Sequence, residues 1–289
     1  MSKTHWVALT TAARVGGKTI TRLLEHFGTL EAVFEATPNE LIQVPHVGKQ
    51  TANAITRIDL GAVEADLEGM TQRGIQVLTW EDAAFPANLL RCEDAPPVLF
   101  VRGTLLPCDV RAVAVVGTRT PSPSSIELAN RLAFELASRG WTIVSGLAVG
   151  IDRAAHQGAL ASGGRTLAVL GSGLERLYPP QHAHLAQNIE GSGAVLSELH
   201  PSVTVSPQNL IARNRITSGL SRAVIVVQSG QDSGSVSTAR RAWGQGRKVF
   251  AVTGGDTGCD ALLQAGAEAI YPDQIEWDTL AEALADCKG

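Results

Sequence analysis

Three short loops rich in glycine and hydroxyl groups contain residue types that could hold a phosphate group. Each lies beyond a run of apolar, mostly β-branched residues, and together they contribute Gly117, Thr118, Arg119, Ser145, Gly146, Gly234 and Ser235. Glycine lets the backbone approach a ligand closely, and amides at helix N-termini act with Ser and Thr hydroxyls as phosphate cradles. The guanidinium of Arg119 would add a bidentate phosphate contact or a plane on which a base can stack. The loops therefore predict an anion-binding site.

Two further arginines stand close together later in the chain, in the triplet Arg213, Asn214 and Arg215. By default, two arginines on a helix belong to a solvated face. Here Ile216 and its apolar neighbours give the helix expected over 207–220 an apolar face, which fixes the directions in which the arginines point. We therefore expect the triplet to join the three loops at one site.

The charge of the chain is small overall but unevenly distributed. Its 289 residues carry 24 lysines and arginines against 28 acids, a net charge of −4. Residues 201–250 hold seven basic residues and one aspartate, a local charge of +6, whereas residues 251–289 hold one lysine and eight acids, a local charge of −7. A locally basic surface on an acidic protein can bind phosphate while the remainder resists non-specific association. The alternative is that these charges scatter over several faces.

The cysteines and the apolar runs argue against several classes of protein. Cys92, Cys108, Cys259 and Cys287 lie far apart, which predicts free thiols in a reducing compartment and neither a disulfide framework nor a metal site. No run approaches the ~18 apolar residues that a membrane span needs, and no apolar signal core follows the N-terminus. We therefore expect a cytoplasmic protein with no membrane partner.

Two glycine motifs resemble nucleotide-binding signatures incompletely. Residues 15–19 look like the end of a P-loop, but Ala12 stands where the first glycine belongs and no strand precedes it. Gly171 and Gly173 begin a dinucleotide fingerprint whose third glycine is replaced by Arg176. We expect no cofactor at either motif.

Residues 1–65 are expected to form a small all-helical domain. Thr37, followed by Glu40 three residues later, predicts a capped helix start. Residues 44–52 place a tight turn between two helices, the pattern of a SAM-like or helix-hairpin-helix unit, although His46 stands where that pattern has a glycine. The turn amides could meet a DNA phosphate. A role in packing or protein contact is the alternative.

Residues 66–289 are expected to form a Rossmann-like domain that ends in a short acidic tail. Strands buried on both faces of a parallel sheet are predicted at residues 112–116, 142–144, 166–170, 223–227 and 249–252. Helical segments fit between them as crossovers, which gives a doubly wound, mostly parallel α/β sheet. Ligands of such sheets sit beyond the carboxyl ends of the strands, where the loops above lie. Residues 81–108 are expected to form an extended lead-in.

The order of these motifs resembles one family closely, DNA-processing protein A, also called DprA or Smf. The matching stretches are Val116–Arg119, Ile143–Asp152 with His156, Leu167–Leu174 with Tyr178 and Pro179, Leu196–Glu198, Arg213–Arg215 with Gly219–Ser221, Ser233–Ala239, and Gly246–Val252. The resemblance runs from about residue 70 to 270, and the N-terminal helices fit the family's N-terminal domain. We expect no winged-helix domain of the kind that many members carry after this region.

The resemblance implies a homodimeric protein of natural transformation that is not an enzyme. Such a protein binds incoming single-stranded DNA, shields it and loads the RecA recombinase on it. Its cationic pocket would contain Arg119, Arg213 and Arg215, with the glycine and serine loops lining the same area. No cofactor or metal is implied.

The sequence departs from the family's pattern at several positions near this pocket. Leu210 and Ile211 replace a Phe-Pro pair ahead of Arg213, His182 stands where asparagine is usual, and Gln228 where glutamate is usual. These differences bear on the fine contacts with DNA more than on the fold.

Two other functions fit the same fold. Lysine-decarboxylase-like nucleotide phosphoribohydrolases bind nucleoside phosphates at equivalent loops, but residues 233–241 offer arginines in place of their catalytic glutamate. Asp152, His156 and Glu198 are the remaining acid–base candidates, and a structural role is expected for each, as a cap or on a helix face. A nucleotide-binding sensor needs the same phosphate cradle as a DNA-binding protein, so the sequence leaves this alternative open.

Overall fold

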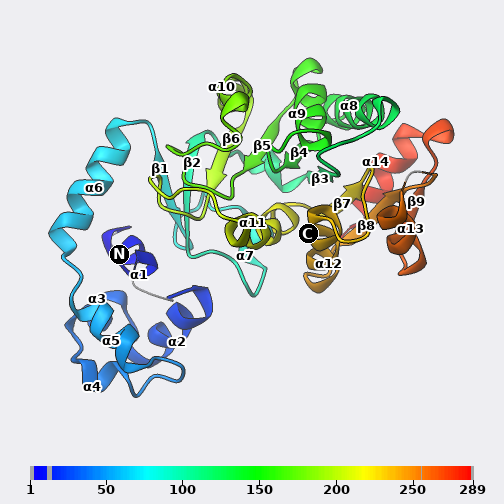
Figure 1. Ribbon diagram of the computed structural model, residues 1–289. Helices are drawn as coiled ribbons and strands as arrows, with labels where there is room; N and C mark the ends of the chain where they lie inside the picture. Colours follow the sequence, from blue (N-terminus) through cyan, green and yellow to red (C-terminus); the bar gives the residue numbers. More distant parts are fainter. Residues whose placement is uncertain (1–2, 12–14, 255, 288–289) are drawn as a thin grey trace.

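A single mixed sheet organises the chain. The computed structural model describes residues 3–11, 15–254 and 256–287. Within these ranges nine strands pair in the order β1-β2-β6-β5-β4-β3-β7-β8-β9 (Figure 1). The strands are β1 (Gln76–Thr79), β2 (Val98–Gly103), β3 (Ala112–Val116), β4 (Thr142–Ser145), β5 (Thr166–Val169), β6 (Ala194–Ser197), β7 (Ala223–Val226), β8 (Lys248–Val252) and β9 (Glu268–Ile270). All pairs from β6 to β9 along this order are parallel, which confirms the predicted doubly wound, mostly parallel sheet.

The central strands are buried on both faces, which explains their unbroken apolar sequences. Along β3, Val113 and Val115 face one side of the sheet and Ala114 and Val116 face the other, and each is at most 5% exposed. Burying a side chain of this size contributes about 1.5–3 kcal/mol. The five strands predicted from such runs are present as β3, β4, β5, β7 and β8.

Helices cover both faces of the sheet, as the two layers in Figure 1 show. One face carries α8 (Pro123–Ser138), α9 (Ile151–Ala161), α10 (Ala183–Ser192) and α14 (Trp277–Ala285). The opposite face carries α7 (Ala87–Leu90), α11 (Pro207–Leu220), α12 (Gly234–Gly244) and α13 (Thr257–Gln264). The helical segments predicted between the strands are therefore confirmed as crossovers.

Residues 81–108 do not form the extended lead-in that we expected. They contain α7 and β2, and β2 pairs antiparallel with β6, so that Phe100 lies opposite Ser197. β1 then pairs antiparallel with β2 and closes this edge. The apolar run of β2 is short and lies among prolines and acids, which concealed it in the sequence.

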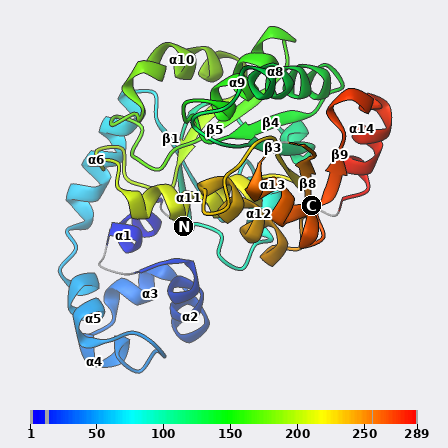
Figure 2. The same cartoon turned by 45° about the vertical axis from the view of Figure 1, so that its right-hand side comes forward.

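The N-terminal helices cluster beyond the β1 edge of the sheet (Figure 2). They are α1 (Lys3–Thr11), α2 (Gly17–Phe27), α3 (Leu30–Glu35), α4 (Pro38–Leu41), α5 (Lys49–Thr56) and α6 (Leu60–Gln72). The predicted capped start is present: Thr37 Oγ1 accepts from the Glu40 amide at 3.4 Å, and the Glu40 carboxylate accepts from the Thr37 amide at 2.7 Å. The expected domain boundary at residue 65 falls within α6 and stays a prediction.

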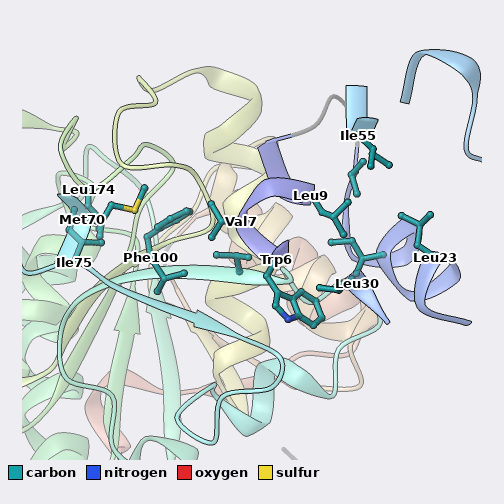
Figure 3. Close-up of a cluster of buried hydrophobic side chains, with 14 of the residues drawn as sticks. Trp6, Val7, Leu9, Leu23, Leu30, Ile55, Met70, Ile75, Phe100 and Leu174 are labelled. Atoms are coloured by element: carbon teal, nitrogen blue, oxygen red, sulfur yellow. The ribbon is translucent and has the colours of Figure 1, made fainter. Parts of the chain in front are cut away.

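One apolar core joins these helices to the sheet (Figure 3). Trp6 and Val7 of α1 are at most 2% exposed, and they belong to the same buried cluster as Leu30 of α3 and Phe100 of β2. The Trp6 ring also meets the Trp80 ring edge-on, with 5.6 Å between centroids. α1 therefore packs against the helical cluster and the sheet edge at once.

The hairpin between α4 and α5 forms although histidine stands at its glycine position. His46 is exposed and has a φ of 67°, in the left-handed region that glycine adopts without strain. A residue with a Cβ is sterically strained there, because the Cβ approaches the following carbonyl oxygen. The hairpin thus keeps the backbone shape that the motif requires while carrying this strain.

We predict that His46→Gly stabilises the protein. The strain at a left-handed residue is of order 1 kcal/mol, and the greater freedom of glycine in the unfolded chain offsets part of the gain. The free energy of unfolding, measured by chemical denaturation, should rise by about 0.5 kcal/mol. His26→Gly, at an exposed position inside α2, is the control and should lower it by a similar amount. A loss of stability in His46→Gly would contradict this account.

Candidate nucleic-acid interface

The loops after β3, β4 and β7 meet α11 and α12 around one cavity at the carboxyl edge of the sheet. The cavity has a volume of about 670 Å³. Eight of the ten site residues predicted from the sequence line it, namely Gly117, Thr118, Arg119, Gly146, Arg213, Asn214, Gly234 and Ser235. This is the position at which doubly wound sheets bind their ligands.

Arg119 is the exposed cation at this cavity, and its loop is tied to neighbouring strands. A Cβ on Gly117 would lie 2.6 Å from Cγ1 of Ile151, so glycine is needed where the loop passes α9. The Thr118 amide donates to the Gln228 carbonyl at 2.7 Å. The Gln228 side chain in turn accepts from the backbone amide of the residue before α8 at 2.9 Å. These contacts hold the backbone of Arg119 while leaving its side chain exposed.

Arg213 is a buried cation on α11, only 7% exposed. Its Nη1 donates to the carbonyl of Val169 at the end of β5, whereas its Nε has no hydrogen-bond partner in the structure. A Cβ at position 146 would collide with the guanidinium, which explains the glycine there. Burial lowers the pKa of Arg213, and the neighbouring charge of Arg119 lowers it further. Arginine still keeps its proton, so the cavity contains a desolvated positive charge.

Asp152 is the single carboxylate among the described residues that line the cavity. It lies in the first turn of α9 and accepts from the amides of Gly146 and Ala148 at 3.1 and 3.4 Å. Burial raises the pKa of Asp152, and the charge of Arg213 opposes that rise. Asp152 therefore orders the loop after β4 and offsets part of the positive charge. Two arginines against one carboxylate leave the cavity cationic.

The N-terminus of α12 opens into the cavity. Ser233 caps the helix, because its Oγ accepts from the Val236 amide at 3.4 Å. Asn214 Nδ2 donates to the Gly234 carbonyl at 3.1 Å and so joins α11 to α12. The positive end of the α12 dipole and its first amides favour an anion at this point.

Ser145 and Arg215 do not line the cavity. The Ser145 hydroxyl donates to the Val115 carbonyl at 2.7 Å and is fully buried. Arg215 donates from Nη2 to Glu198 at 2.5 Å, and its Nε lies 3.9 Å from Asp94. Residues two apart on a helix point in nearly opposite directions, so Arg213 and Arg215 cannot share one face. Glu198 is thus structural, as expected, but as the partner of an arginine and not as a cap.

Several residues that line the cavity are not among the ten predicted site residues, and three of them are Tyr178, Ile211 and Thr217. Tyr178 is 41% and Ile211 is 54% exposed, whereas the Thr217 hydroxyl is buried without a hydrogen-bond partner in the structure. Thr217 follows Arg213 by one helical turn, so helical spacing could have found it. Tyr178 lies well beyond β5, and only the tertiary structure brings it here.

The loop after β4 holds a strained residue. Leu147 is fully buried with a φ of 60°, in the left-handed region that side chains rarely adopt. His182 donates from Nδ1 to the Leu147 carbonyl at 2.8 Å. Strain of this kind persists where the surroundings determine the backbone, often at functional sites.

His156 lies on α9 and is fully buried. The Thr166 hydroxyl donates its hydrogen to the Ile143 carbonyl at 2.8 Å. His156 Nδ1 lies 2.6 Å from the Thr166 oxygen and must therefore donate to it. Burial, followed by the charges of His182 and Arg213, lowers the pKa of His156 to about 3. The imidazole is therefore neutral and structural, as its helix position predicted.

The described part of the chain offers few other functional features. No group of three or more His, Cys, Asp or Glu side chains within it is placed to hold a metal ion. None of its helices combines the length and apolar character that crossing a membrane requires. Its four cysteines are free thiols.

The fold and the cavity define a Rossmann-like α/β protein with a cationic pocket at the carboxyl edge of its sheet. Residues 76–281 match the profile of DNA recombination-mediator protein A, and residues 7–57 match that of a SAM-like helix-hairpin-helix tandem. The chain belongs to the DNA recombination-mediator protein A family. This confirms the resemblance to DprA and Smf proteins that the motifs indicated.

Individual relatives agree with this assignment. Protein Smf of Synechocystis sp. is 36% identical over 280 residues, which cover 93% of this chain and 70% of that protein. The crystal structure of DprA from Streptococcus pneumoniae superposes with a TM-score of 0.83 at 31% identity and covers 98% of both chains. A structure of DNA processing protein A from Helicobacter pylori, which addresses its single-stranded DNA binding mode, has a TM-score of 0.65 at 30% identity. It covers 73% of this chain and 95% of that one.

We predict that His156 makes the folded protein sensitive to acid. The unfolded chain protonates this histidine below its ordinary pKa of 6.5, whereas the folded protein does so only near pH 3, so stability is lost as pH falls through this window. The free energy of unfolding of wild type minus that of His156→Asn should decrease by up to about 1.4 kcal/mol for each pH unit below pH ~6. Chemical denaturation between neutral pH and pH ~4.5 measures this difference.

The exposed His184 on α10 supplies the control for the His156 test. His184→Asn removes an imidazole that is already exposed to water, so it separates the effect of burial from the effect of losing a histidine. A pH-independent difference for His156→Asn would show that folding does not change the pKa of the buried imidazole, which would contradict this account.

Proposed function

We propose that this chain binds single-stranded DNA in the cationic cavity. The observation that carries the proposal is the buried Arg213, which lines the cavity beside Arg119 and whose Nε has no hydrogen-bond partner in the structure. A buried charged donor without a partner is costly, and a phosphate oxygen would satisfy it. The unpartnered hydroxyl of Thr217 and the first amides of α12 offer further donors to the same anion.

The edge of the cavity suits a nucleic-acid strand better than an isolated phosphate. Tyr178 and Ile211 both line the cavity and are 41% and 54% exposed, so they present an aromatic ring and an aliphatic surface beside Arg119. Unstacked bases bind such surfaces without regard to sequence. The Helicobacter pylori relative, whose single-stranded DNA binding mode has been addressed structurally, supports this choice of ligand.

Membership of the DNA recombination-mediator protein A family gives the chain a DNA-processing role. Within that role we propose that it protects incoming single-stranded DNA and loads RecA on it during natural transformation, acting as a cytoplasmic homodimer and not as an enzyme. A dimer would offer two cationic cavities to one strand, so avidity would raise the affinity. Light scattering of the purified chain tests the dimer, and RecA filament formation on DNA covered by a single-strand-binding protein tests loading.

A nucleotide-binding sensor is the second candidate, because the cavity of about 670 Å³ lies in the usual size range of small-molecule sites. A nucleoside-phosphate hydrolase is less well supported. Asp152, the single carboxylate among the described residues that line the cavity, already accepts from two backbone amides of the loop after β4. Competition by mononucleotides against a labelled oligonucleotide separates the sensor from the DNA-binding protein.

We predict that Arg119→Ala and Arg215→Ala differ in their effects although each removes one positive charge. Arg119→Ala removes a phosphate contact and should weaken binding about tenfold and reduce the salt slope by ~0.7. Arg215→Ala should leave the affinity nearly unchanged and lower the free energy of unfolding by about 1 kcal/mol, since Arg215 pairs with Glu198 and Asp94. Fluorescence anisotropy with a ~30-nucleotide single strand and its duplex, over a salt series, measures the affinity and the salt slope of each variant. Chemical denaturation measures the free energy of unfolding.

Wild type should prefer the single strand, and its affinity should fall steeply with salt. If the two substitutions change the affinity equally, only the net charge of the protein matters for binding. That result would contradict the proposal that DNA binds in the cavity. Mononucleotides that displace the strand at micromolar concentration would favour the sensor.

A further inference from the structure

A second cationic groove lies where the N-terminal helices approach the sheet domain. It has a volume of about 570 Å³ and is formed by α2, the segment after α7 and the last turn of α12. The charged residues that line it are Lys18, Arg91, Glu93, Asp94, Arg240 and Arg241. No role was assigned to this groove from the sequence, because its residues come from three distant segments.

Arg240 and Arg241 are two of the four basic residues that line this groove, with Lys18 and Arg91. Lys18 is paired with Glu93 at 2.5 Å, and Asp94 lies 3.9 Å from Arg215, so both acids in the groove already have cationic neighbours. Arg240 and Arg241 are exposed, and within the described ranges neither forms an ion pair. Two such guanidiniums at the edge of a concave surface attract an anion and can contact a phosphate directly.

α12 connects this groove to the first cavity. Gly234 at the start of α12 lines the first cavity, and Gly244 at its end lines the second. At 1.5 Å per residue, the helix places the two sites roughly 15 Å apart. A single strand spans such a distance with a few nucleotides. α7, α11 and α12 all lie on the same side of the sheet (Figure 1), so a strand would not have to pass around the sheet.

We propose that Arg240 and Arg241 form a second phosphate-binding site, which continues the path of one DNA strand from the first cavity along α12 toward α2. The inference rests on the proposed function and extends it. The first cavity holds one part of the strand and the groove holds a phosphate a few nucleotides away. The strand then runs beside the N-terminal helices, which gives this part of the chain a place in DNA binding.

Oligonucleotide length separates the two sites. A strand of ~6 nucleotides is expected to occupy the first cavity alone, whereas one of ~20 nucleotides reaches both. Arg240→Ala/Arg241→Ala should therefore weaken binding of the longer strand about tenfold and leave binding of the shorter one within about twofold. The salt slope of the longer strand should decrease by about 1.4, because two phosphate contacts are lost at ~0.7 each for single strands. Unchanged binding of the shorter strand also shows that the variant is folded.

The matched control is Arg131→Glu, which changes the net charge by the same two units. Arg131 is exposed on α8, which packs on the opposite face of the sheet from α12. This variant should bind both strands like wild type. An equal loss in Arg131→Glu, or no loss of long-strand affinity in Arg240→Ala/Arg241→Ala while wild type binds both strands, would overturn the second site and leave the first intact. Failure of wild type to bind either strand would overturn the proposed function and this inference with it.

Discussion

A buried guanidinium constrains the architecture of the site. Arg213 lies almost out of contact with water, and removing a charge from water costs several kcal/mol unless neighbouring groups compensate. The structure compensates with the carbonyl at the end of β5 and the nearby carboxylate of Asp152. That carboxylate in turn orders the loop after β4, and Gly146 in this loop has no side chain because the guanidinium fills the space. One charge on α11 thus couples the ends of β4 and β5 to the start of α9.

The neighbouring groups compensate the charge of Arg213 only in part, which leaves the cavity with unpartnered donors and a net positive charge. Arg213 keeps one buried donor without a partner, Thr217 keeps an unpartnered hydroxyl, and Arg119 adds a second, exposed cation. Buried polar groups in folded proteins are ordinarily satisfied, so unsatisfied donors beside a cavity suit the anionic ligand that we propose. Leu147 adds backbone strain at the same place, and His182 helps to hold it.

The antiparallel edge explains how the N-terminal helices become part of one body with the sheet. β1 and β2 extend the sheet past β6, and α1 packs its Trp6 and Val7 into a core shared with Phe100 of β2. A groove that uses α2 together with α12 can exist only because this core fixes the two relative to each other. The basic residues between 201 and 250 therefore do not form a single patch. Arg213 is buried at the cavity, Arg215 is paired within the structure, and Arg240 and Arg241 line the groove.

The sequence by itself determined the parallel centre of the sheet, its crossovers and the convergence of the predicted loops on one cavity. Runs such as 112–116 are apolar at every position because both faces of a parallel strand are covered, and the helix expected over 207–220 coincides with α11. Since loops at the carboxyl ends of parallel strands converge, eight of the ten predicted site residues line one cavity. The tertiary structure alone decided which arginines face that cavity, because the helical rotation between Arg213 and Arg215 matters only once α11 is docked. It also decided the antiparallel edge and the place of Tyr178, because contacts between segments distant in sequence leave no periodic signal along the chain.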